Sequence, residues 1–267
     1  MRAKKSLGQN FLVDANCQRR IVDALRPEPE DEVVEVGPGR GALTRHLVGR
    51  VRRLLLVELD DSLVSELRAR WGGQDGVEIV HGDVLRIDLP ELVARPDALK
   101  VVGNIPYSIT SPLLFRLLEP PRPAVVLVMV QREVGERLLA DPGTAAYGAL
   151  AVGVRSVADV ERVLQVPRQA FRPVPRVDST VVRITPHAPP RISEAEEDAL
   201  RTLVRAAFQW RRKQLQKILR EHPDLRLGRE LVDRLGTETG LVLTDRPERL
   251  SPDELIRLSR AVAAARG

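Results

Sequence analysis

Five short apolar runs near the start of the chain limit its possible folds more than any other feature. They are rich in β-branched residues and cover residues 33–36, 54–59, 77–80, 100–103 and 124–130. Strands that are buried on both faces have this composition, as in a parallel sheet covered by helices. Amphipathic stretches of helical length lie between the runs, and such alternation is typical of an open α/β sheet. We therefore predict an α/β fold for this part of the chain.

Two more strand-like segments, residues 160–166 and 179–185, follow the alternating region. Residues 171–175, which are expected to form a proline-rich loop, separate them, and we expect the pair to form an antiparallel edge of the sheet. The composition then changes at residues 186–190, Pro-His-Ala-Pro-Pro, which is typical of a linker. A boundary between two domains is therefore expected after Pro186.

The periodicity is helical from the linker to the end of the chain. We predict a small all-α domain at residues 187–267, after a catalytic domain at residues 1–186 that includes a basic N-terminal arm. Residue types that begin or end helices indicate about four helices there: Ser193 with Glu196, Ser251 with Pro252 and Glu254, Gly236 and Gly240.

The composition excludes several classes of protein. No apolar run approaches the roughly 18 residues that a membrane helix needs, and no secretory signal follows the basic N-terminus. Cys17 is the only cysteine, so neither a disulfide framework nor a cysteine-rich zinc site can form. The four histidines are too scattered to indicate another metal site. We expect a cytoplasmic protein without a metal and without a membrane partner.

A glycine-rich turn follows the first apolar run. Gly37 and Gly39 allow a sharp turn and the close approach of a ligand to the backbone. Glu58 ends the second run, where a carboxylate can accept both ribose hydroxyls of an adenosine. Asp83 comes after the third run and can contact the adenine amino group, and the adjacent Val84 is predicted to belong to the same cofactor site. Three successive strand ends thus indicate one nucleoside-like ligand.

Two classes of ligand fit this turn. Gly37, Gly39 and Ala42 match the G-x-G-x-x-A pattern of dinucleotide-binding proteins, in which a helix N-terminus holds a pyrophosphate. A methyltransferase would instead place the amino-acid part of S-adenosylmethionine (SAM) at the turn. Glu35 favours the methyltransferase, because a carboxylate there repels a pyrophosphate and attracts the ammonium group of SAM. An NAD(P)-dependent oxidoreductase is the competing hypothesis at this point.

The tetrapeptide Asn104-Ile105-Pro106-Tyr107 distinguishes the two hypotheses. The amino group of adenine is a poor nucleophile because its lone pair is delocalised into the ring. The side-chain oxygen of Asn104 and a backbone carbonyl, expected to be that of Ile105, can accept its two hydrogens and favour a more pyramidal nitrogen. Pro106 fixes the local backbone, and Tyr107 offers a ring on which a flipped base can stack. The tetrapeptide therefore indicates methylation of an adenine amino group.

These motifs occur in an order that resembles one known family along nearly the whole chain. Besides the motifs already described, the shared segments are residues 6–12, 130–134 and 171–179. The chain is similar to the KsgA-type ribosomal RNA adenine dimethyltransferases, a family that also contains the Erm-type antibiotic-resistance methylases. The resemblance implies a Rossmann-like, SAM-binding α/β sheet flanked by helices, with a small helical C-terminal domain.

The resemblance also implies roles for single residues. Those implied to line the SAM site are Asn10, Leu12, Gly37, Glu58, Asp83 and Asn104. Tyr107 and Phe171 are implied to hold the target adenine between their rings. The pair Tyr147-Gly148 and the segment 207–213 are similar to the housekeeping branch, which acts on the small ribosomal subunit. That branch is therefore favoured over the Erm-type branch.

Basic residues cluster at residues 162–176, at residues 201–220 and in the N-terminal arm, and the formal net charge of the chain is +5. Contacts from such clusters to phosphates give salt-dependent and mainly shape-based RNA binding. The alternative for any single cluster is a solvated helix face. The residues predicted to contact RNA are Arg172, Arg176, Arg211, Arg212 and Lys213.

The expected reaction is direct transfer of the SAM methyl group to N6 of adenosine, with S-adenosylhomocysteine as the second product. Two transfers would give N6,N6-dimethyladenosine at adjacent adenosines near the 3′ end of 16S rRNA. Asn104 and the Ile105 carbonyl would act by positioning and polarisation. The alternatives are a ribosome-assembly factor in which methylation is secondary, and an Erm-type methylase of large-subunit rRNA. A monomer is expected, because nothing in the sequence suggests an obligate oligomer.

Overall fold

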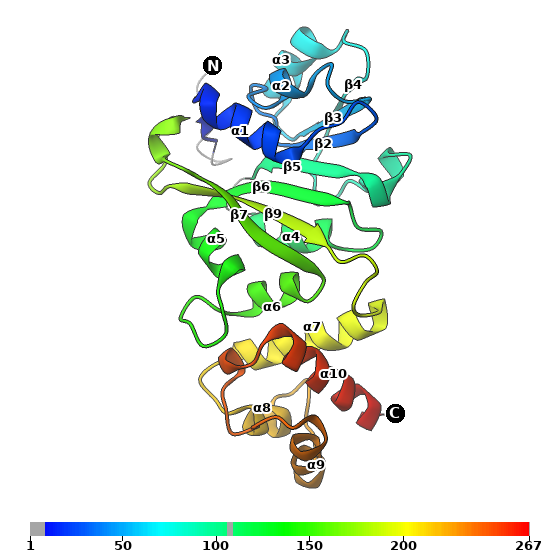
Figure 1. Cartoon of the computed structure of the whole chain (residues 1–267), viewed down its shortest axis with the longest axis vertical. Coiled ribbons are helices and arrows are strands. Elements are labelled where there is room, and N and C mark those ends of the chain that lie inside the picture. Colours follow the sequence, from blue (N-terminus) through cyan, green and yellow to red (C-terminus); the bar gives the residue numbers. More distant parts are fainter. Residues whose placement is uncertain (1–8, 106–108, 267) are drawn as a thin grey trace. The chain divides into compact units, whose positions relative to one another are not determined.

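The computed structural model describes residues 9–105 and 109–266, and the chain forms two compact units (Figure 1). The first unit extends to Gly135 and also includes Val160–Pro186, whereas the second contains Glu136–Asp159 and the residues from His187 onward. The expected boundary after Pro186 coincides with one limit of these units. The segment Glu136–Asp159 differs from that expectation, since it belongs to the second unit.

A seven-stranded sheet forms the centre of the first unit, in the order β4-β3-β2-β5-β6-β9-β7. Its strands are β2 (Glu32–Val36), β3 (Arg53–Glu58), β4 (Val77–His81), β5 (Lys100–Asn104), β6 (Val125–Gln131), β7 (Ala158–Val166) and β9 (Ser179–Pro186). Strands β2 to β6 run parallel to one another, and β9 runs antiparallel to β6. The predicted α/β fold is confirmed.

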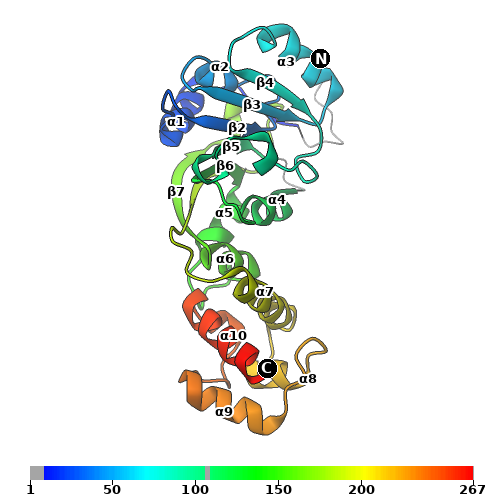
Figure 2. The same ribbon diagram turned by 90° about the vertical axis from the view of Figure 1, so that its right-hand side faces the viewer.

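Helices cover the sheet, and Figure 2 shows α1 and α4 on opposite sides of it. The helices of this region are α1 (Ala15–Leu25), α2 (Thr44–Leu47), α3 (Asp61–Trp71), α4 (Thr110–Leu117) and α5 (Arg132–Leu139). One face of the sheet packs in an apolar cluster that joins Ile21 of α1, Leu47 of α2 and Leu67 of α3 to Leu54 and Leu56 of β3. The strand order changes direction between β2 and β5, and open α/β sheets bind ligands outside the carboxyl ends of strands at such a point.

Two short strands connect the N-terminal arm to the proline-rich segment. β1 (Phe11–Leu12) pairs antiparallel with β8 (Phe171–Arg172), with Phe11 opposite Arg172 and Leu12 opposite Phe171. The expectation that residues 171–175 form a loop is therefore wrong for the first two of them. Their backbone groups find partners in the arm, which lies far from them in the sequence.

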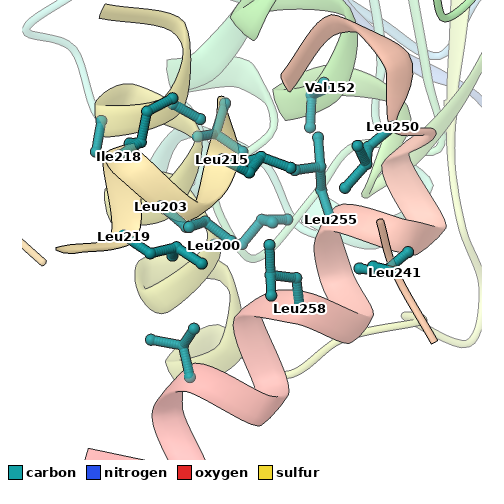
Figure 3. Close-up of a cluster of buried hydrophobic side chains, with 14 of the residues drawn as sticks. Val152, Leu200, Leu203, Leu215, Ile218, Leu219, Leu241, Leu250, Leu255 and Leu258 are labelled. Atoms are coloured by element: carbon teal, nitrogen blue, oxygen red, sulfur yellow. The ribbon is translucent and has the colours of Figure 1, made fainter. Parts of the chain in front are cut away.

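Helices make up the core of the second unit. They are α6 (Ala149–Arg155), α7 (Glu194–Gln209), α8 (Leu215–Glu221), α9 (Arg229–Thr239) and α10 (Pro252–Arg266). Figure 3 shows Val152 of α6 close to Leu215, Leu250 and Leu255 in one buried cluster. The hydroxyl of the buried Tyr147 donates a hydrogen bond to the carbonyl of Leu250 at 2.8 Å. These contacts explain why residues 136–159 belong to the helical unit.

The predicted helix ends are confirmed except at one position. Ser193 and Glu196 form the expected capping box at the start of α7, and Ser251 and Glu254 exchange hydrogen bonds at the start of α10. Gly240 ends α9 with φ +67°, but Gly236 lies inside that helix and does not end it. Within the described part of the chain, no helix is both long and apolar enough to cross a membrane.

Candidate active site

A cavity of about 480 Å³ lies at the carboxyl ends of β2, β3 and β5. The predicted site residues that line it are Asn10, Leu12, Glu35, Gly37, Gly39, Glu58, Asn104 and Ile105. The structure thus brings the N-terminal arm, the glycine-rich turn and the ends of three strands to one place. Pro106 and Tyr107 lie outside the described residues.

Asp83 and Val84 do not belong to the lining of this cavity. Asp83 follows β4, where its Oδ1 accepts a hydrogen bond from the Leu85 backbone N–H at 3.0 Å and its Oδ2 lies 3.8 Å from Nε of Arg86. Val84 is buried. Contact of either residue with an adenine therefore stays a prediction that requires the ligand to extend along the sheet edge.

The backbone of the glycine-rich turn lies close to aromatic rings at two positions. A Cβ on Gly39 would lie 3.2 Å from the ring of Phe11, and a Cβ on Gly41 would lie 1.9 Å from the ring of Trp71. Both glycines have positive φ angles, of +58° and +73°, which other residues rarely adopt. A side chain at position 41 would therefore clash with α3, whereas one at position 39 would require a small shift of the Phe11 ring.

The Glu58 carboxylate holds the glycine-rich turn at the end of β3. Its Oε2 accepts a hydrogen bond from the Gly39 N–H at 3.1 Å, and its Oε1 accepts from the N–H groups of Leu59 and Asp60 at 2.9 and 3.0 Å. A carboxylate has about four acceptor positions, so these three donors leave capacity for a hydroxyl group of a ligand.

Glu35 is a buried carboxyl group on the floor of the cavity. Burial raises its pKa to about 7, and the charge of Glu58 adds to that effect. Hydrogen bonds from Thr44 act in the opposite direction, and the Thr44 hydroxyl donates to Oε2 of Glu35 at 2.6 Å. A cationic group bound next to Glu35 would favour its ionised form, because opposite charges stabilise each other at short range.

The side-chain amide of Asn104 has a defined orientation. Its Nδ2 donates a hydrogen bond to the backbone carbonyl of Asn10 at 3.1 Å. Only the NH₂ end of an amide can donate to a carbonyl, so this bond leaves Oδ1 as the acceptor for a ligand. The N–H of the next residue, Ile105, donates to the carbonyl of Met129 on β6 at 3.2 Å, which fixes the backbone at this strand end.

The residues predicted to contact the target base and the adjacent RNA differ in exposure. Phe171 is only 1% exposed and packs in the apolar cluster of the sheet. A base can stack on this ring only after neighbouring groups move. Arg172 lines the cavity, and its guanidinium donates to the carbonyls of Gln169 and Phe171 at 2.9 and 2.8 Å. Arg176 is exposed.

The three basic residues predicted in the helical unit have two different environments. Arg211 is partly buried, where its Nε lies 3.0 Å from Glu248 and its Nη2 donates to the carbonyls of Thr144 and Ala145. Arg212 and Lys213, the next two residues, are exposed. Arg211 thus joins three segments of its own unit, while Arg212 and Lys213 are accessible to a polyanion.

Sequence reasoning missed several residues that line the cavity, namely Gln9, Phe11, Gln18, Arg40 and Arg45. The guanidinium carbon of Arg40 lies 4.8 Å from the centroid of the Phe11 ring, and Gln9 donates to Asp60 at 2.9 Å. Gln9 and Phe11 stand in the segment 6–12 beside Asn10, so that motif carried a signal for them. Gln18 lies on α1, and no motif pointed to it.

A Rossmann-like sheet, a glycine-rich turn after its first parallel strand and an acidic residue at the end of the next strand are common to dinucleotide-binding proteins and SAM-dependent methyltransferases. The carboxyl group of Glu35 in the same cavity favours the class of SAM-dependent methyltransferases. The family described as "Ribosomal RNA adenine dimethylase" matches residues 1–229. The chain belongs to this family.

Named relatives and solved structures agree with the family. The ribosomal RNA small subunit methyltransferase A of Geobacter metallireducens is 44% identical over 270 residues, which cover 100% of this chain and 98% of that protein. A dimethyladenosine transferase structure from Plasmodium falciparum has a TM-score of 0.78 at 26% identity and covers 93% of this chain and 95% of that chain. The 23S rRNA methyltransferase ErmE has a TM-score of 0.72 at 29% identity, with coverages of 95% and 100%.

Proposed function

We propose that this protein transfers methyl groups from SAM to N6 of adenosines in small-subunit (16S) rRNA, and that it forms N6,N6-dimethyladenosine. The observation that carries the proposal is the oriented amide of Asn104. It lies in the same cavity as the glycine-rich turn and Glu58, and its Oδ1 is left to accept from an amino group. The full-length relationship to small-subunit methyltransferase A proteins supports the choice of 16S rRNA over 23S rRNA.

The cavity fits SAM in size and in chemistry. Its volume of about 480 Å³ lies within the range of small-molecule sites. Glu58 has acceptor capacity for one ribose hydroxyl besides its three backbone donors, and Glu35 offers a carboxyl group to the ammonium of the methionine part. Gly37 has no side chain beside the backbone carbonyl of Asn104, and a Cβ at position 37 would lie 3.5 Å from that oxygen. The space that a side chain would take there is left to the ligand. When bound, SAM supplies an activated methyl group.

The residues of this chain act on the adenine by positioning and polarisation. Asn104 Oδ1 accepts one hydrogen of the amino group, and the Ile105 carbonyl is the proposed acceptor for the other. Both bonds favour a pyramidal nitrogen whose lone pair is available for attack. Because the bond to Asn10 fixes the amide before the base arrives, little reorganisation is needed in the transition state. Tyr107 and Phe171 are proposed to hold the base by stacking.

The RNA is proposed to bind through exposed cations of both units. The proposed contacts are Arg172, which lines the cavity, and the exposed Arg176 in the first unit, and Arg212 and Lys213 in the helical unit. Each phosphate contact would add to the salt dependence of binding. Arg211, the fifth residue predicted to contact RNA, is already engaged with Glu248 and two carbonyls, and we assign it a structural role instead.

The test is methyl transfer from tritiated SAM to naked rRNA, to small subunits and to large subunits, followed by nucleoside analysis. We expect N6,N6-dimethyladenosine in 16S rRNA and no label in 23S rRNA. Label confined to 23S rRNA would instead establish the activity named for ErmE. Tight SAM binding without any label would favour an assembly factor whose main act is RNA binding.

A further inference from the structure

Gln18 is a buried polar residue of α1 that the proposed reaction does not use, although it belongs to the lining of the active-site cavity. Only 3% of the residue is exposed. Its Nε2 donates to the Leu12 carbonyl at 2.9 Å, and its Oε1 lies 3.2 Å from Nε2 of His46 on α2. One amide therefore connects α1, β1 and α2.

The bond between His46 and Gln18 fixes which way the amide points. An amide oxygen can only accept, so Nε2 of His46 carries the proton in this arrangement. Burial lowers the pKa of His46, and the charges of Arg45, Arg19 and Arg50 act in the same direction. A neutral imidazole with its proton on Nε2 satisfies this bond. With Oε1 bound to His46, the NH₂ end of Gln18 faces Leu12.

Leu12 presents its backbone groups at the edge of β1 that does not pair with β8. Val13 N–H donates across the ladder to the carbonyl of Ala170 at 2.8 Å. In an antiparallel pair, consecutive residues turn their N–H and C=O groups alternately toward and away from the partner strand. The backbone groups of Leu12 therefore face away from β8, and those of Asn10, two residues earlier, face the same way. We call this side of residues 10–12 the outer edge of β1.

Two side-chain amides bind the outer edge of β1. Gln18 donates to the Leu12 carbonyl, and Asn104 donates to the Asn10 carbonyl at 3.1 Å. These carbonyls are only two residues apart, at the end of β1 and just before its start, so a displacement at Leu12 also moves Asn10. The orientation of Asn104 thus depends on a strand that Gln18 holds in place.

We propose that Gln18, oriented by His46, is a positioning residue for methyl transfer. Gln18 fixes the outer edge of β1 and thereby the position of the Asn10 carbonyl, which orients Asn104. It also fixes the position of Leu12, which lines the cofactor cavity. The proposal rests on the proposed function of this cavity. Gln18 acts through β1 and does not bond to the reacting nitrogen.

The test compares Gln18→Leu with Val22→Ala in the full-length protein. Leucine keeps most of the volume of glutamine but cannot donate to Leu12. Val22 lies one turn further along the same helix, is fully buried and packs in the apolar cluster that also contains Leu12. Its truncation therefore destabilises α1 without removing a bond to the outer edge of β1. We would measure thermal unfolding, the KM for SAM and kcat on an rRNA substrate that the wild type methylates.

We expect Gln18→Leu to raise the KM for SAM about fivefold, as for the loss of one hydrogen bond. We expect it to lower kcat about tenfold or more, because a small displacement of the reacting groups from their productive positions slows the reaction strongly. His46→Phe, which keeps a ring but cannot donate, should change both parameters in the same direction and by less. Val22→Ala should lower the unfolding temperature and change neither parameter by more than about twofold.

Unchanged KM and kcat in Gln18→Leu would overturn the proposal. So would a Val22→Ala variant with the same kinetic losses, because destabilisation of α1 would then explain them. If Gln18→Leu does not fold, the kinetics of His46→Phe test the proposal instead. This variant keeps Gln18 and removes the hydrogen bond from His46 that orients its amide. The wild type serves as the separate test of function: an inactive wild type contradicts the proposed reaction, whereas an active wild type with an equally active Gln18→Leu contradicts only the role of Gln18.

Discussion

Asn104 has two chemically different ends, and within the described part of the chain only its NH₂ group has a hydrogen-bond partner. The NH₂ group is bound by the Asn10 carbonyl, which leaves the oxygen for the substrate. A free asparagine could rotate its amide and present the wrong end to an amino group. The contact with the arm removes that freedom, so a residue near the N-terminus contributes to chemistry at the end of β5.

Substitution of Asn104 should separate catalysis from RNA binding. In Asn104→Ala we expect methyl transfer to fall by about 100-fold or more, as for the loss of a preorganised polar group. Affinity for rRNA should stay within about twofold, because phosphate contacts dominate binding. Filter binding and single-turnover methylation measure the two properties. An equal loss of RNA affinity would show that Asn104 also contributes to binding.

Glu35 should make stability depend on pH. The folded state holds its proton up to a pKa of about 7, whereas the unfolded chain releases it near 4.5. The folded state therefore binds more protons between these values, and the free energy of unfolding should fall as pH rises from about 4.5 to about 7. Each pKa unit corresponds to about 1.4 kcal/mol, so the effect is on the order of a few kcal/mol.

Glu35→Gln is the matched variant for this effect, since glutamine keeps an acceptor for Thr44 and cannot titrate. Urea unfolding of the wild type and the variant at pH 5 and at pH 8 would measure it. We expect the variant to gain stability relative to the wild type at pH 8 and to show a smaller difference at pH 5. Equal pH dependence of the two proteins would contradict the raised pKa.

At the scale of elements, the glycine-rich turn and α3 depend on each other through Gly41. Gly41 and Gly49 have nearly the same positive φ, +73° and +75°, but only a Cβ on Gly41 would meet another residue, Trp71. Gly49→Ala should cost roughly 1–2 kcal/mol of unfolding free energy from backbone strain. Gly41→Ala should cost roughly 1–3 kcal/mol more, because the added methyl group overpacks the core. Chemical denaturation measures both, and equal losses would contradict the steric account.

The parallel strands β2, β3, β5 and β6 could be predicted because each is a nearly continuous apolar run that is mostly buried. β4 lies at the edge of the sheet and has no fully buried residue, so the expectation of burial on both faces is wrong for residues 77–80. β1 and β8 have two residues each, which is too short for a periodic signal, and their pairing joins Phe11 to Arg172 across the chain. Gly236 shows a second limit. A glycine ends a helix when the backbone turns left-handed, as at Gly240, and the residue type alone does not show which glycine does so.

The candidate site was predictable where a motif carries its own chemistry, as at Glu35, Glu58 and Asn104. It was not predictable where a residue acts through a distant partner. Gln18 contacts Leu12 and His46, and neither contact has a sequence pattern. The partner of Arg211 is Glu248, 37 residues away, so a basic cluster in the sequence did not reveal which arginine is engaged.

At the scale of the whole molecule, the two neighbouring arginines of the helical unit should respond differently to substitution. Arg212→Ala should weaken rRNA binding and reduce its salt dependence, with little change in the unfolding temperature, because the side chain is exposed. Arg211→Ala should lower the unfolding temperature, because it frees the partly buried Glu248 and two carbonyls. Calorimetry and binding at several salt concentrations test both. A normal unfolding temperature for Arg211→Ala would contradict its structural role.

The assignment of Glu136–Asp159 to the helical unit has a consequence for synthesis of the protein. The strands of the sheet have all been synthesised once β9 emerges, but the partners of Tyr147 and Val152 include Leu250 and Leu255, which are synthesised 103 residues later. Until that moment the segment is an apolar loop between two strands of a finished sheet, and exposed apolar surface of this kind promotes aggregation. Premature termination after Pro186 would make this state permanent, so truncated chains should depend on chaperones or be degraded.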